Sequence, residues 1–189
     1  RDACRYCGLF LVAEGERAMR KRNTPVWMSC TGWLLLLCCG TVIPSALAAE
    51  PAMAPDFALK ADSGRNLRLR ELRGQVVMLN FWATWCGPCR EEMPKLQQLY
   101  SKYHKTGFVL LGVNIDDNPA NAVGMARKLG VTFPVLFDKD KSVSQLYKVD
   151  AMPSTVLIDR DGKTRYLHRG YKPGYEATYQ TQLRELLKE

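Results

Sequence analysis

One stretch of the sequence decides the fold: Val76-Val77-Met78-Leu79-Asn80-Phe81-Trp82-Ala83-Thr84-Trp85-Cys86-Gly87-Pro88-Cys89. Its first seven residues are apolar or β-favouring, and the run is long enough for a buried central strand. From Cys89 to about Tyr103 the apolar residues recur at helical spacing. The two cysteines therefore fall where a buried strand ends and an amphipathic helix begins.

Strands and helices alternate along the rest of the chain. The pattern predicts a β-hairpin over 57–69 with its turn at 62–64, strands over 108–115, 133–137, 155–158 and 164–171, and helices over 119–129, 143–147 and 176–187. The strand–helix–strand unit must be parallel, whereas a four-residue turn makes the last two strands antiparallel. We therefore expect an α/β fold in which a central mixed β-sheet is flanked by helices, with an added N-terminal β-hairpin.

The first fifty residues differ from the rest. Met19-Arg20-Lys21-Arg22 begins a basic stretch, an apolar run follows, and Ala46-Leu47-Ala48 has the small-x-small pattern of a signal-peptidase site. We expect an upstream overhang at 1–18, a signal peptide cleaved after Ala48 or an uncleaved membrane anchor at 19–48, and one globular domain at 49–189. Either form of the leader predicts export to the periplasm.

Charge and cysteine content narrow the function further. The formal net charge is +8 at pH 7, but charges of both signs are interspersed and no basic run is interleaved with aromatic residues. We therefore expect no nucleic-acid partner. Five of the seven cysteines precede residue 40, so the exported domain would keep only Cys86 and Cys89.

The position of this pair at the start of a helix has chemical consequences. Unpaired N–H groups and a partial positive charge at a helix N-terminus stabilise a thiolate, so we expect Cys86 to be an acidic, exposed nucleophile. Cys89, one turn further, is placed to attack a mixed disulfide formed at Cys86. Gly87 allows close approach of a substrate, and Pro88 suits the first turn because the N–H that it lacks would be unpaired there.

Other interpretations of the pair carry less weight. A zinc site needs two further ligands, and the exported domain offers only His104 and His168, without recognisable ligand spacing. A purely structural disulfide closing so short a loop would constrain the unfolded chain little. Unreactive buried thiols stay open as an alternative, but the motif and its context favour redox activity. We expect neither a metal nor a bound cofactor.

These features resemble the thioredoxin superfamily, and within it the secreted TlpA/ResA-like thiol–disulfide oxidoreductases. The resemblance rests on Pro55-Asp56-Phe57, the run from Asn80 to Pro94, Phe133-Pro134-Val135 and Met152-Pro153-Ser154-Thr155. It implies that Pro153 is a cis-proline facing the cysteines. It also implies that the backbone of Met152 pairs with an extended substrate segment, and that Trp85 flanks the cysteines as an apolar docking surface.

The resemblance assigns a role to Glu92 as well. In ResA-like proteins a glutamate three residues after the second cysteine lies beside the thiols and tunes proton transfer. Thioredoxin has a buried aspartate at the position that is Asn80 here, so Glu92 is the candidate replacement. The alternative is a solvated glutamate on the helix surface, which is our interpretation of its neighbour Glu91.

The leading prediction is a protein-disulfide reductase acting on disulfide-containing exported proteins, through a mixed disulfide at Cys86 resolved by Cys89. The Gly-Pro pair between the cysteines resembles that of thioredoxin, whose reduction potential lies at the reducing end of the known range. Such a reductase implies a membrane electron donor of the DsbD or CcdA type. Cytochrome c maturation is the best-known task of this branch, but Ser154 stands where the dedicated relatives have a glutamate.

The alternatives to a reductase are a thioredoxin-fold binding module or chaperone and a peroxide-scavenging enzyme. We expect a monomer.

Overall fold

The computed structural model describes residues 51–189. The predicted overhang and the predicted signal peptide or anchor lie outside the described residues. Within 51–189, no helix has both the length and the apolar character needed to cross a membrane.

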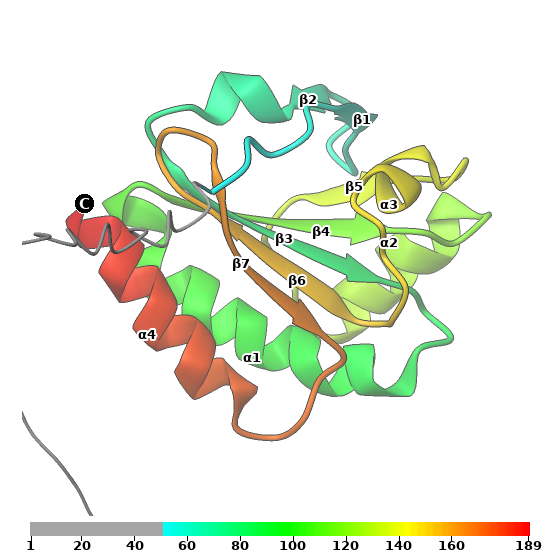
Figure 1. Cartoon of the computed structure of the whole chain (residues 1–189). Helices are drawn as coiled ribbons and strands as arrows, with labels where there is room; N and C mark the ends of the chain where they lie inside the picture. Colours follow the sequence, from blue (N-terminus) through cyan, green and yellow to red (C-terminus); the bar gives the residue numbers. More distant parts are fainter. Residues whose placement is uncertain (1–50) are drawn as a thin grey trace, which may run out of the picture. The chain divides into compact units, whose positions relative to one another are not determined.

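A five-stranded mixed sheet forms the centre of the domain, in the order β5-β4-β3-β6-β7 (Figure 1). The strands are β3 (Val76–Trp82), β4 (Phe108–Asn114), β5 (Val135–Phe137), β6 (Ser154–Ile158) and β7 (Thr164–Arg169). β3 and β5 are parallel to β4, whereas β6 is antiparallel to both β3 and β7. A separate antiparallel hairpin pairs β1 (Ala58–Lys60) with β2 (Asn66–Arg68). The predicted α/β fold, its strand directions and the added hairpin are confirmed.

Four α-helices and two short 3-10 helices complete the domain. They are η1 (Leu69–Leu72), α1 (Gly87–Tyr103), η2 (His104–Thr106), α2 (Pro119–Lys128), α3 (Ser142–Leu146) and α4 (Tyr175–Lys188). Each predicted helix is present within a few residues of its expected bounds. The predicted start of α2 is confirmed, because the Asn118 side chain accepts the N–H of Ala120 and Pro119 occupies the first turn.

Several predicted ends are shifted for local reasons. α1 begins at Gly87 rather than Cys89, because the Cys86 side chain already caps the helix. β4 ends at Asn114, one residue early. β5 begins at Val135 rather than Phe133, since Pro134 has no N–H to give to a ladder. β7 ends at Arg169 because Gly170 takes a φ of +73°.

The residues of β3 alternate between two cores, one on each face of the sheet. Its even-numbered apolar residues pack with α1, α2 and α4, whereas its odd-numbered residues pack with the hairpin, η1 and α3. Figure 1 shows α1 and α4 together on one face and the hairpin on the other. Because side chains alternate along a strand, Asn80 points to the α1–α4 face. This placement puts a polar side chain inside an apolar core, directly beneath the helix that carries the cysteines.

Candidate active site

The cysteine segment leaves the carboxyl end of β3 and turns directly into α1. Cys86 is the N-cap residue, and its Sγ accepts the backbone N–H of Cys89 at 3.2 Å. Pro88 lies in the first turn, as expected. Cys86 and Cys89 form a disulfide, with their Cα atoms 5.3 Å apart. The two thiols that the motif places one helical turn apart are therefore joined in the folded protein.

The expected exposure of Cys86 is wrong for the disulfide form. Cys86 is 5% exposed and Cys89 0%. The Cys86 sulfur points back onto the helix N-terminus, and both cysteines pack into the core cluster beneath α1. What exposure remains in the pair belongs to Cys86, the first of the two cysteines.

The loop before Cys86 is fixed by hydrogen bonds to both backbone polar groups of one residue, Thr84. The backbone N–H of Thr84 donates to the Asp116 carboxylate at 3.1 Å, and the Thr84 carbonyl accepts from Arg90 Nη1 at 2.8 Å. Asn114 Nδ2 holds the same carboxylate at 2.9 Å. Trp85, the next residue, is 66% exposed on this fixed loop. The sequence did not reveal Asp116 or Arg90, because neither spacing nor motif indicates which loop a carboxylate after β4 will contact.

Replacing Asp116 by alanine is expected to lower the free energy of unfolding by about 1 to 3 kcal/mol, because the Thr84 N–H and the Asn114 amide lose their buried acceptor. Urea denaturation of the oxidised protein measures this loss. Asp117→Ala is the matched control, since the side chain of Asp117 is 84% exposed and pairs only with Lys141 on the surface. Equal losses in the two variants would show that Asp116 does not hold the loop.

The second wall of the site comes from the segment before β6. The Met152–Pro153 peptide bond is cis, as the resemblance implies. Ser154 pairs with Phe81 of β3, so Pro153 lies beside the end of the strand from which the cysteine segment departs. Met152 is half-buried and packs against the cluster that contains both cysteines. The pairing of its backbone with a substrate stays a prediction.

A groove of about 450 Å³ runs between Trp85 and Met152. Ile115 and Val149 add apolar surface to it. Trp85 and Met152 belong to the two segments that flank the disulfide, although neither cysteine lines the groove itself. No neighbouring atom of the protein requires a glycine at position 87, because a Cβ atom there would meet only Arg90 Nη2, at 4.0 Å.

Glu92 is completely buried, which excludes the interpretation as a solvated surface glutamate. Its Oε2 accepts from Asn80 Nδ2 at 2.7 Å, and its Oε1 accepts from the Tyr179 hydroxyl at 2.8 Å. Glu91 is exposed, as expected. Residues three apart on a helix are neighbours on one face, so Glu92 lies next to Cys89 on the buried face of α1.

Burial controls the protonation of this carboxyl. Removal from water raises the pKa of Glu92 to about 7, against the opposing effect of hydrogen bonds from Tyr179, Asn80 and Thr155. Near neutral pH both the charged and the neutral form are therefore populated. A carboxyl poised in this way can accept or release a proton beside Cys89.

Tyr179 is the residue of this site that the sequence did not reveal. The helical pattern at 176–187 places Tyr179 with Leu183 and Leu186 on the buried face of α4. That pattern predicts a core tyrosine, but it contains no signal for a contact with Glu92, which lies 87 residues earlier in the chain.

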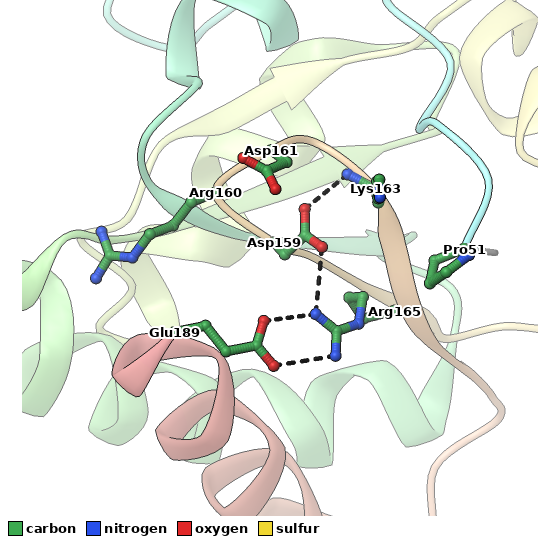
Figure 2. Close-up of a pocket in the computed structure, with 7 residues that line it drawn as sticks. All are labelled: Pro51, Asp159, Arg160, Asp161, Lys163, Arg165 and Glu189. Carbon is green, nitrogen blue, oxygen red and sulfur yellow. Dashed lines mark hydrogen bonds and ion pairs between the residues drawn. The ribbon is translucent and has the colours of Figure 1, made fainter.

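A second pocket lies at the opposite end of the sheet, beyond the turn between β6 and β7. Figure 2 shows that charged side chains line it and that Arg165 lies between the carboxylates of Asp159 and Glu189. Arg165 pairs with Asp159 at 3.3 Å and with both carboxylate oxygens of Glu189. Its lining includes no thiol or hydroxyl nucleophile. Within 51–189, no group of three or more His, Cys, Asp or Glu side chains is arranged to hold a metal ion.

Comparison with known proteins places the site in a family. The AhpC/TSA family profile matches residues 52–167. The thiol–disulfide oxidoreductase ResA of Geobacillus thermodenitrificans is 37% identical over 158 residues, which cover 80% of this chain and 91% of the relative. ResA of Bacillus subtilis is 36% identical over 141 residues, covering 70% of this chain and 79% of that protein.

A solved structure supports the same family assignment. A Chlorobium tepidum protein provisionally named thiol:disulfide interchange protein DsbE superimposes with a TM-score of 0.70 at 37% identity, covering 72% of this chain and 96% of the other. The family profile, the relatives and the fold agree with the buried strand, the disulfide at the helix N-terminus and the cis-proline. The chain therefore belongs to the AhpC/TSA family and is a TlpA/ResA-like thiol–disulfide oxidoreductase with a thioredoxin fold.

Proposed function

We propose that this protein reduces disulfides in exported proteins, with Cys86 as the nucleophile and Cys89 as the resolving thiol. The observation that carries the proposal is the disulfide at the start of α1, in which only Cys86 keeps any exposure. The helix N-terminus stabilises a thiolate at that position. The covered position of Cys89 protects it from outside partners and keeps it within reach of its neighbour.

The reaction starts from the reduced pair. The Cys86 thiolate attacks one sulfur of the substrate disulfide, so that the substrate S–S bond breaks, a Cys86–substrate S–S bond forms and one substrate thiolate leaves. Cys89 then loses its proton and attacks the Cys86 sulfur, which releases the second substrate thiolate and forms the Cys86–Cys89 disulfide. Two electrons pass to the substrate, and a reducing donor must return two electrons to the pair.

Glu92 is the proposed acceptor of the Cys89 proton. It lies one turn from Cys89, is buried with it, and has a pKa raised to about 7 by burial. A general base works best when its pKa lies near the operating pH. Asn80 occupies the position of the buried aspartate of thioredoxin and acts here as a hydrogen-bond donor to Glu92.

The groove supplies the proposed docking surface for the substrate. Trp85 offers a large exposed apolar face directly before Cys86, and Met152 forms the other wall. An extended segment on either side of a substrate cysteine fits between them, with its backbone along Met152. Pro88 is exposed in the first turn of α1 and completes the rim near the disulfide.

The place of action follows from the sequence rather than from the fold. We propose that the leader directs the domain to the periplasm, where it works as a monomer. A membrane dithiol donor of the DsbD or CcdA type would return electrons to it. Ser154 is buried and its hydroxyl donates to the Ala151 carbonyl at 2.7 Å. The position after the cis-proline thus holds no charge toward a partner, which favours a general reductase over one dedicated to cytochrome c maturation.

Trapping the mixed disulfide tests the substrate class. Cys89→Ser protein expressed in the native host is expected to accumulate thiol-sensitive adducts with exported, disulfide-containing proteins, identified by mass spectrometry. The double variant Cys86→Ser/Cys89→Ser is the control and should capture none. Adducts confined to cytosolic proteins, or none at all, would contradict the proposal.

Trp85→Ala is expected to lower kcat/KM for insulin reduction by roughly tenfold without changing the free energy of unfolding, because an exposed aromatic anchor contributes to docking and little to folding. The change should appear mainly in KM. Leu167→Ala, which removes an exposed side chain from the edge strand β7, is the matched control and should leave KM unaltered. A KM for Trp85→Ala equal to that of the control would remove Trp85 from the docking surface.

A further inference from the structure

A buried polar row crosses the sheet beneath α1 and α4. Asn80 of β3 pairs in register with Thr155 of β6, and Thr155 pairs with His168 of β7. Asn80 Nδ2 donates both to Glu92 and to Thr155 Oγ1, the latter at 2.9 Å. Among the residues described, Asn80 Oδ1 has no hydrogen-bond partner. The Asn80 amide is therefore oriented with its NH2 group toward the two acceptors, Glu92 and Thr155.

The two oxygens of Glu92 have different kinds of donor. Oε2 faces the NH2 group of Asn80, and the amide can accept a hydrogen bond from a protonated Oε2 only after it rotates to present its oxygen. Oε1 faces the hydroxyl of Tyr179, which changes from donor to acceptor by turning one O–H bond. Protonation at Oε1 therefore needs no movement of a heavy atom, whereas protonation at Oε2 does.

Tyr179 is suited to such a change of role. It is 1% exposed, and both burial and the neighbouring Glu92 charge raise the pKa of its hydroxyl, so it keeps its own proton. The Thr155 hydroxyl interacts with both Tyr179 and Glu92. When the Tyr179 hydroxyl turns away from Glu92, Thr155 Oγ1 is the nearby oxygen toward which its hydrogen can point.

From this geometry we propose that Tyr179 is a positioning residue for the redox reaction, which fixes the Glu92 carboxylate and directs the incoming proton to Oε1. The inference rests on the proposed role of Glu92 as acceptor of the Cys89 proton. In that step the Cys89 S–H bond breaks and an O–H bond forms at Oε1. Tyr179 keeps its hydrogen, which turns from Glu92 to Thr155. The last helix of the fold is thereby part of the redox site.

Other groups surround this pair on every packed element and are candidates to influence it. They are Cys89 on α1, Asn80 on β3, Thr155 on β6, His168 on β7, Tyr171 before α4, and Tyr175 and Glu176 on α4. Among residues 51–189, Asn80 and Tyr179 donate the short hydrogen bonds to the Glu92 carboxylate, at 2.7 and 2.8 Å. The effect of removing the Tyr179 hydroxyl should therefore be specific.

Carbon-13 NMR titration of the Glu92 side-chain carboxyl in the oxidised full chain tests the inference, with the resonance assigned by its loss in Glu92→Gln. Tyr179→Phe removes the donor to the charged form and is expected to raise the pKa of Glu92 by about 1 to 2 units. Tyr175→Phe is the matched control: it lies one turn earlier on α4, with its ring 6.3 Å from that of Tyr179, and should leave the pKa unchanged. Equal pKa values in both variants would overturn the inference.

Two further measurements keep the outcome clear. If Tyr179→Phe does not fold, 3,5-difluorotyrosine at position 179 alone, a stronger donor, should lower the pKa of Glu92, and an unchanged value would again overturn the inference. Insulin reduction is followed on the same preparations. Wild-type protein without reductase activity would refute the proposed function, whereas an active wild type with no shift in Tyr179→Phe would refute only the role of Tyr179.

Discussion

Cys86→Ser protein is expected to reduce insulin no faster than dithiothreitol alone. A serine hydroxyl cannot form the mixed disulfide, and no other thiol is present between residues 51 and 189 except the covered Cys89. The turbidity of precipitating insulin B chain reports the rate directly. The loss should be complete, because the first covalent step itself is removed rather than slowed.

Cys89→Ser provides the comparison, because it leaves the nucleophile in place. This variant should still form a mixed disulfide with a model disulfide substrate, seen as a thiol-reversible mass increase, but should release product slowly. A Cys86→Ser protein that retained the wild-type rate would leave the binding module or chaperone as the surviving function. Rapid consumption of peroxide by the wild type would instead favour the peroxide-scavenging alternative.

Glu92→Gln is expected to change how stability depends on pH. Burial raises the pKa of Glu92 to about 7 in the folded protein, from the ordinary glutamate value of 4.5, so the unfolded chain loses this proton first as the pH rises. The wild-type free energy of unfolding should therefore fall between about pH 4.5 and 7 relative to the variant, by about 3 kcal/mol in total. Below pH 4.5 Glu92 is protonated in both the folded and the unfolded protein, so it no longer makes the free energy of unfolding depend on pH.

Urea denaturation of the oxidised protein between pH 4 and 8 measures this difference. Glu91→Gln is the matched control, because Glu91 is the adjacent exposed glutamate of α1. Its stability curve should run parallel to that of the wild type over the same range. Parallel curves for Glu92→Gln as well would mean that the buried carboxyl does not titrate near neutrality.

The same variant separates the stability of the site from its chemistry. Without a base beside Cys89, resolution of the mixed disulfide at pH 7 should slow by about 10²-fold or more, the usual contribution of general-base catalysis. The apparent pKa values of the two thiols should also shift. If both thiol pKa values and the rate of resolution equal those of the wild type, Glu92 has no part in the proton transfer.

Local patterns in the sequence were sufficient for most of the fold. The run at 76–82, apolar at every position except Asn80, became β3 without a shift, because a strand buried on both faces consists mainly of apolar residues. The Asp159–Gly162 turn fixed the antiparallel pairing of β6 and β7, since so short a connection allows no crossover. The cis form of Pro153 was found through resemblance of the motif around it, and not from local physics.

The sequence alone determined the strand–helix junction and the paired cysteines, because each depends on residues close together in the chain, whereas the candidate carboxyl came from the resemblance. Tertiary structure alone decided the surroundings of the cysteines and of Glu92. These are the burial of Cys86, the hydrogen bonds of Asp116 and Arg90 to the Thr84 backbone, and the contact of Tyr179 with Glu92. The contact of Tyr179 with Glu92 exists only because α1 and α4 pack on one face of the sheet, and that of Asp116 with Thr84 only because β3 and β4 are neighbours in it. Spacing along a chain carries no information about which side chains such packing will bring together.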